Sequence, residues 1–196
     1  MATLLYQGHG SLRVTTDRGN VIYIDPFAGA GYDAPADLIL VTHQHPDHNR
    51  TELPARQPGC VVWQNSDALK NGEYRTLRLD FAVAEAVEAY NHHHKREECV
   101  GYILTVDGKT VYFAGDTGQT GQMSRMAERR LDYAVLPIDG VYTMDLPEAI
   151  RCAGLIAAGH TIPVHMAPGA LFDPKRASRF TVPGALIVAP GEEIRL

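Results

Sequence analysis

Residues 42 to 48 read Thr-His-Gln-His-Pro-Asp-His, a run that places three histidines and one aspartate within six positions. Imidazole nitrogen and carboxylate oxygen are ligands that zinc, manganese and iron(II) accept. His43 and His45 are two residues apart, so a locally extended segment would present both on one side. The proline that follows disfavours helical geometry, so Asp47 and His48 lie beyond a bend and can point elsewhere. The run therefore predicts a dinuclear metal site, with two of its ligands for each ion.

Further candidate ligands follow predicted strands in the rest of the chain. Residues 90–94 read Tyr-Asn-His-His-His, and at least one of these histidines is expected to be a ligand. Spacing alone leaves three alternatives open: His92, His93 and His94. Asp116 lies between glycines at the end of a strand pattern, and a carboxylate can bridge two cations with its two oxygens. His165 ends a short apolar segment and would supply a ligand that the second ion still lacks.

The elements that must position these side chains are mostly short strands. β-Branched and aromatic patterns predict strands over residues 12–15, 21–24, 37–41, 60–63, 81–90, 102–106, 110–114 and 162–165. Hairpin turns are indicated by residues 17–20 and by Asp107-Gly108. Helical patterns cover residues 121–130, 146–158 and 174–179, and Asp145 is the expected N-cap of the second. Two strand-rich halves with helices toward their ends predict a β-sandwich flanked by helices.

Length and composition set the class of protein. A chain of 196 residues with 45% hydrophobic residues suits a single domain over residues 1–196. The formal net charge of -5 gives no global basic field, so nucleic acid is not expected as a partner. No stretch approaches the roughly 20 apolar residues that cross a bilayer, and no signal peptide is apparent. Three widely spaced cysteines, Cys60, Cys99 and Cys152, indicate a reduced cytoplasmic protein.

These segments, in this order, resemble the metallo-β-lactamase fold superfamily of metal-dependent hydrolases, and the resemblance covers nearly the whole chain. The matching segments are residues 8–11, 24–27, 42–48, 87–91, 101–103, 114–117, 139–144, 163–165 and 190–193. The resemblance implies an α/β fold, a four-layer αββα sandwich. The Gly-Asp-Thr and Tyr-Thr-Met segments look most like a bacterial and archaeal branch of predicted zinc-dependent hydrolases that also resembles the ascorbate-6-phosphate lactonases.

The resemblance also implies a ligand set for two divalent ions, zinc first and manganese or iron as alternatives. The first ion would be bound by His43, His45 and one histidine of residues 92–94, and the second by Asp47, His48 and His165. Asp116 would bridge the two ions. His93 is preferred in the first group because His93-His94-Lys95 matches a His-Pro-Lys stretch of the family, and His94 and His92 stay open.

The implied activity is hydrolysis by a hydroxide that bridges two ions, on a small ester, lactone or phosphodiester. Asp47 would orient the nucleophile, and Tyr142 is either an oxyanion donor or a tyrosine packed beside the site. His9 either orients a ligand or belongs to the core. A lactonase-like enzyme with a small-molecule substrate is the first choice. A phosphodiesterase or nuclease is second, a non-catalytic metal-binding regulatory protein is third, and a homo-oligomer is left open.

Overall fold

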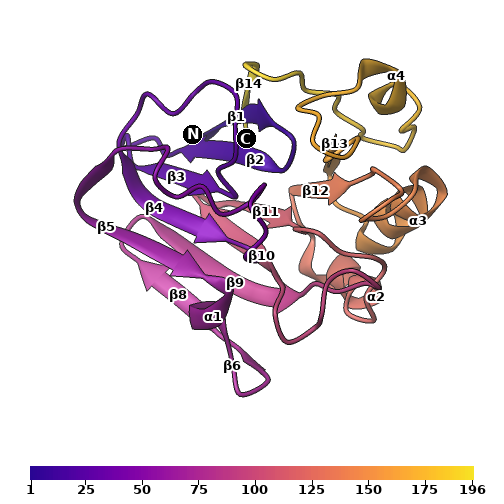
Figure 1. Cartoon of the computed structure of the whole chain (residues 1–196), viewed down its shortest axis with the longest axis horizontal. Coiled ribbons are helices and arrows are strands. Elements are labelled where there is room, and N and C mark those ends of the chain that lie inside the picture. Colours follow the sequence, from indigo (N-terminus) through magenta and orange to yellow (C-terminus); the bar gives the residue numbers. More distant parts are fainter.

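The computed structural model describes all 196 residues, and its framework is a pair of six-stranded sheets (Figure 1). The first sheet has the order β14-β1-β2-β3-β4-β5 and the second the order β13-β12-β11-β10-β9-β8. The strands of the first are β1 (Thr3–Gly8), β2 (Ser11–Thr15), β3 (Val21–Ile24), β4 (Ala36–Val41), β5 (Arg56–Gln64) and β14 (Glu193–Arg195). Those of the second are β8 (Thr76–Leu79), β9 (Ala82–Glu88), β10 (Val100–Val106), β11 (Lys109–Phe113), β12 (Tyr133–Pro137) and β13 (His160–Val164). A small hairpin of β6 (Leu69–Lys70) and β7 (Glu73–Tyr74) lies between them in sequence.

Both sheets combine antiparallel and parallel pairs in the same way. In the first sheet β1, β2 and β3 are antiparallel neighbours, and β4 and β5 are added parallel to β3. In the second sheet β8 to β11 are antiparallel, and β12 and β13 are added parallel to β11. The carboxyl ends of parallel strands meet at one edge of a sheet, where side chains can converge. Each sheet therefore offers one such edge for a site.

The main core lies between the sheets, and helices cover the outer face of the second sheet. Inward-facing residues such as Leu4, Ile24, Tyr102 and Phe113 are buried in one apolar cluster drawn from both sheets. A second cluster joins the other face of the second sheet to the helices α2 (Met123–Met126), α3 (Leu146–Ile156) and α4 (Pro174–Ala177), which lie together on one side in Figure 1. The expected α/β sandwich is confirmed.

The outer face of the first sheet has a different cover. Its buried residues, among them Tyr23, Ile39 and Val41, pack against Tyr32 and Ala34 of the segment that joins β3 to β4. The ring of Tyr32 stacks on Tyr23 with centroids 5.5 Å apart. A loop thus covers this face of the first sheet, whereas the short helix α1 (Asn65–Ala68) places Ala68 in the core between the sheets.

Most predicted elements are present, with differences at their ends. The strand expected over residues 81–90 ends at Glu88, and the helix expected over 121–130 is one α-helical turn followed by a 3₁₀ turn. The N-cap is confirmed, since the Asp145 carboxylate accepts a hydrogen bond from the amide of Glu148. Strands β1, β6, β7, β8, β12 and β14 have no counterpart in the prediction. No helix of the chain combines the length and apolar character needed to span a membrane.

Candidate metal centre

Histidine and aspartate side chains from both sheets converge at the edge where the parallel strands end. Three groups each bring their possible ligand atoms within 4.8 Å of one another. They are His43 with His45 and His94, Asp47 with His9, His48 and His165, and Asp25 with His43 and His48. Of the ligands predicted from the sequence, all but His93 fall in these groups or, in the case of Asp116, at their centre.

The loop that carries four of these residues is pinned at its start. The amide and the hydroxyl of Thr42 both donate to the carboxylate of Asp25, at 2.7 and 2.6 Å. The carbonyl of Thr42 accepts from the amide of Val100, which ties the loop to the second sheet. The tight turn expected at the proline is closed by a 3.0 Å hydrogen bond from the amide of His48 to the carbonyl of His45. Both sheets therefore fix where the loop begins.

Asp116 is the residue on which the two histidine groups meet. Its Oδ1 lies 3.3 Å from Nε2 of His48, and its Oδ2 lies 3.3 Å from Nε2 of His165 and 3.4 Å from Nε2 of His94. Nε2 of His43 is 3.9 Å from the same Oδ2. The two oxygens of one buried carboxylate thus face histidines of both groups, which is the arrangement predicted for a bridging ligand.

A glycine beside Asp116 lets the backbone come this close. Gly115 has a φ of +63°, and a Cβ there would lie 2.9 Å from Cβ of Thr42. Any side chain at this position would push β11 away from the loop after β4. The sequence predicts a sharp turn at the glycines after this strand. Gly115 is also required because no side chain fits between it and Thr42.

The histidine of residues 92–94 that lies with His43 and His45 is His94, the alternative, whereas the preferred His93 lies outside the group. Nδ1 of His94 lies 3.0 Å from Oδ1 of Asn91, and its Nε2 lies 3.2 Å from Nδ1 of His45. Asn91 Oδ1 also accepts from the amides of His93 and His94, at 2.7 and 3.0 Å, and so forms a turn that carries His94 inward. The side chain of His93 points outward, where its ring packs edge-on against Tyr142 at 5.4 Å.

Four buried rings have Nε2 facing Asp116 and a polar group beside Nδ1, and they belong to His43, His48, His94 and His165. For His48 the neighbour is Asp25, whose Oδ2 is 2.8 Å away, and for His43 it is the hydroxyl of Thr42 at 3.0 Å. Nδ1 of His165 lies 3.3 Å from Oδ2 of Asp139. Such outer partners fix the ring orientation and tautomer of metal-binding histidines. The roles of Asn91 and Asp139 were missed in the sequence, where the only signal was their place next to predicted strands and ligands.

The buried nitrogens show whether these residues fit a cation. Nε2 of His43, His48 and His165 is buried and makes no hydrogen bond, although Asp116 is close to each. A buried polar atom without a partner is costly, so structures rarely contain several in one place. Histidine nitrogens and carboxylate oxygens turned toward one another without hydrogen-bond alignment fit divalent cations between them. The residues present therefore fit a metal centre.

The electrostatics of the cluster agree with this fit. Burial would lower the pKa of His48, but the carboxylates of Asp116 and Asp25 raise it well above its usual value. Burial would likewise lower the pKa of His165, and Asp116 with Asp139 raises it to about 9. The pKa of His43 is held well below normal by its burial and by the neighbouring His48. Without cations, the carboxylates of the cluster thus draw protons onto two of its histidines.

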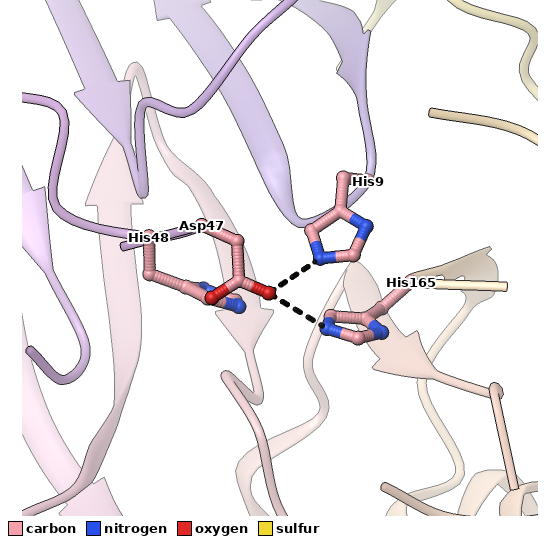
Figure 2. Close-up of side chains that lie close together, drawn as sticks. All are labelled: His9, Asp47, His48 and His165. Atoms are coloured by element: carbon pink, nitrogen blue, oxygen red, sulfur yellow. Dashed lines mark hydrogen bonds and ion pairs between the residues drawn. The ribbon is translucent and has the colours of Figure 1, made fainter. Parts of the chain in front are cut away.

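His9 is part of the second group and is completely buried. Figure 2 shows Oδ2 of Asp47 between the rings of His9 and His165, 3.0 Å from Nε2 of His9 and 3.9 Å from Nε2 of His165. The other nitrogen of His9 lies 3.1 Å from the carbonyl oxygen of Ala170. His9 adopts a left-handed backbone with a φ of 55°, as do Asp25 and His165 with φ of 47° and 46°. Of the two roles expected for His9, orienting a ligand is the one this position favours.

Tyr142 lies outside the histidine cluster. Its side chain is 47% exposed, and its carbonyl accepts a hydrogen bond from Nδ2 of Asn91 at 2.8 Å. His92 is also exposed. Both residues line a cavity beside the cluster together with Tyr90, Asn91 and His93.

The chain is similar to known proteins over most of its length. A profile described as "Beta-lactamase superfamily domain" matches residues 3–165. A UPF0173 metal-dependent hydrolase of Geobacillus thermodenitrificans is 30% identical over 97% of this chain and 98% of its own. One of Thermococcus kodakarensis is 30% identical over the whole of both chains.

Solved structures show the same likeness. A putative metal-dependent hydrolase from Parabacteroides distasonis is 29% identical, with a TM-score of 0.79 over 95% of this chain and 92% of its own. Igni18, a metallo hydrolase from Ignicoccus hospitalis, is 24% identical and shares the fold, with a TM-score of 0.78 over 98% of this chain and 97% of its own. The chain therefore belongs to the β-lactamase superfamily and has the metallo-β-lactamase fold.

Proposed function

We propose that this protein is a metal-dependent hydrolase that binds two divalent ions and cleaves a small ester, lactone or phosphodiester. The proposal depends on one observation: several buried Nε2 atoms that make no hydrogen bond surround the carboxylate of Asp116. Its curated relatives are named metal-dependent hydrolases, which supports the same reading.

The ligand set divides into two groups that share one carboxylate. His43, His45 and His94 would hold one ion, and Asp47, His48 and His165 the other, with Asp116 between them. When bound, two such ions, zinc first and manganese or iron as alternatives, would make hydroxide available near neutral pH and polarise the bond to be cleaved.

Asp47 is the residue of the cluster best placed to handle a proton. Its side chain is 33% exposed, whereas Asp116 and the histidines around it are nearly inaccessible. Nε2 of His9 donates a hydrogen bond to Oδ2 of Asp47. Burial would raise the pKa of Asp47, but this hydrogen bond and the charge of His48 lower it, so the group is an ionised acceptor at neutral pH. Asp47 can therefore orient a nucleophile and receive its proton.

Several features bear on the substrate and the setting. The cavity beside the cluster has a volume of about 500 Å³, within the range of small-molecule sites. It suits a small substrate better than a nucleic acid polymer, and a lactonase-like activity remains the first choice. The three cysteines are free thiols, which fits a single cytoplasmic domain over residues 1–196.

Elemental analysis of protein purified without added metal, paired with a hydrolase screen, tests the proposal. The screen would include lactones, carboxylic esters and bis-p-nitrophenyl phosphate. We expect two ions per chain and turnover on one of these classes. Asp116→Ala should abolish dinuclear loading, and retention of two ions in that variant would contradict the bridging role. Full occupancy with no turnover on any substrate would instead indicate a metal-binding regulatory protein.

A further inference from the structure

The cavity beside the metal centre is built on the residues that hold the metal ligands in place. Asn91, which orients His94, lines the cavity and donates a hydrogen bond to the carbonyl of Tyr142, a second lining residue. The loop that carries Tyr142 is held by Oδ1 of Asp139, which accepts from the amides of residues 141, 142 and 143. Oδ2 of the same carboxylate lies beside His165. The residues that orient His94 and His165 therefore also shape this cavity.

The lining of the cavity contains one carboxylate, two tyrosine rings and two histidines, and it has no lysine or arginine. Ten residues line the cavity: Tyr90, Asn91, His92, His93, Gly118, Gln119, Val141, Tyr142, Thr143 and Glu148. Arg96 lies over the ring of Tyr90 at 5.5 Å, but it is not part of the lining and is paired with Glu88.

Glu148 is the charged group that faces this space. Its Oε1 accepts a hydrogen bond from the amide of Gln119 at 2.9 Å, and no basic side chain pairs with the carboxylate. Gly118 keeps the approach open, because a Cβ at that position would lie 3.3 Å from Oε1 of Glu148 and 3.4 Å from Cβ of Asn91. A half-buried carboxylate without a cationic partner next to aromatic faces attracts an organic cation.

We propose that this cavity receives the non-reacting part of the substrate and selects an organic ammonium group over a phosphate or carboxylate group. The inference rests on the proposed function. It narrows the substrate class, because a phosphorylated sugar lactone would bring its phosphate toward Glu148 with no lysine or arginine in the lining to receive it. Val141 and Tyr142, which are 55% and 47% exposed, would contact the apolar part of the substrate's ammonium group.

Probe binding tests the proposal without turnover. Benzyltrimethylammonium, benzyl alcohol and benzenesulfonate would be titrated into the metal-loaded protein, with binding followed through the backbone amide NMR shifts of Gln119, Val141 and Tyr142. We expect the ammonium probe to bind tightest and to move these three signals. Glu148→Gln, which keeps an acceptor for Gln119, should weaken ammonium binding about tenfold and change benzyl alcohol binding less than twofold. Glu128→Gln, an exposed carboxylate outside the cavity, is the matched control and should change neither.

A matched pair of phenyl esters, one with a trimethylammonium group and one with a sulfonate, separates this proposal from the proposed function. Tight ammonium binding at the three signals with no hydrolysis of either ester would support the cavity assignment and count against the hydrolase. Hydrolysis of both esters without preference, and with no shifts at the three signals, would overturn the cavity assignment and leave the hydrolase standing. Tightest binding of benzenesulfonate would also overturn it.

Discussion

Oδ1 of Asn91 lies 3.0 Å from Nδ1 of His94, and the same oxygen accepts the backbone amides of His93 and His94. The side chain of Asn91 thus both stabilises the turn and orients the ring of His94. Asn91→Ala should lower the affinity for metal roughly 10- to 100-fold, as is typical when an outer partner of a ligand is removed. Competition with a chromophoric chelator measures this, and unchanged affinity would show that Asn91 does not orient the ligand.

The adjacent histidines provide a matched pair. His94→Ala should remove a ligand of the first group and reduce the metal content toward one ion per chain. His93→Ala should retain two ions, because this ring lies outside the cluster against Tyr142. Elemental analysis of both variants decides, and loss of metal only in His93→Ala would restore the assignment preferred from the sequence.

His9 combines a contact to Asp47 with a left-handed backbone, and two substitutions separate the effects. His9→Asn and His9→Ala both remove the hydrogen bond that holds Asp47, so both should weaken metal binding. Asparagine tolerates a left-handed conformation better than alanine. The free energy of unfolding of His9→Ala should therefore be roughly 1 kcal/mol lower than that of His9→Asn. Urea denaturation of the metal-free proteins measures the difference. Equal stability of the two variants would argue against a backbone cost at this position.

Cysteine reactivity follows from burial. Burial raises the pKa of the Cys99 and Cys152 thiols to about 12, whereas Cys60 is only partly buried. Because the thiolate is the reactive form, a disulfide reagent at pH 8 should modify one thiol in the folded protein and three in urea. Mass spectrometry should place the single modification on Cys60. Rapid modification of Cys99 would show that the second sheet opens readily near the site.

Asp132, which lies away from the metal site, should make the free energy of unfolding depend on pH. Partial burial would raise its pKa, but hydrogen bonds from Thr110 and the charge of Lys109 lower it below its ordinary value of 3.8. A carboxyl whose folded pKa is depressed stabilises the protein above its unfolded pKa, and this stabilisation is lost as the pH falls through the folded value. Asp132→Asn should therefore cost about 1 kcal/mol at pH 7.

The difference between wild type and Asp132→Asn should be constant from about pH 5 to 7 and shrink below about pH 4. Denaturant unfolding of both proteins across this range measures it. A difference that does not change with pH would mean that folding does not lower the pKa of Asp132, so that its charge contributes no stability.

Much of the site could be predicted because its ligands follow strands that the sequence marks clearly. The run after β4 contains four ligands in a spacing that only a tight loop can present, and Asp116 and His165 each follow a short apolar strand. The choice among His92, His93 and His94 could not be made, because three identical neighbours differ only in how Asn91 folds the turn. That contact depends on side-chain geometry and leaves no trace in spacing.

The failure to predict some strands from the sequence also has physical reasons. Tyr133–Pro137 is buried along its whole length, so β12 lacks the alternation that reveals a half-exposed strand. Asp139, which follows β12, was consequently not connected with the site. Strands β8 and β14 lie at sheet edges, and their pairing partners rather than their own residues define them.

The candidate ligands extend from residue 43 to residue 165 and come from both sheets. Contacts between residues so distant in sequence form late in folding, because the intervening chain must first be ordered. Metal would then find no complete set of ligands in the folding transition state. We expect bound metal to slow unfolding while leaving the refolding rate nearly unchanged, so the ions would act on the lifetime of the native protein and not on the speed of its formation.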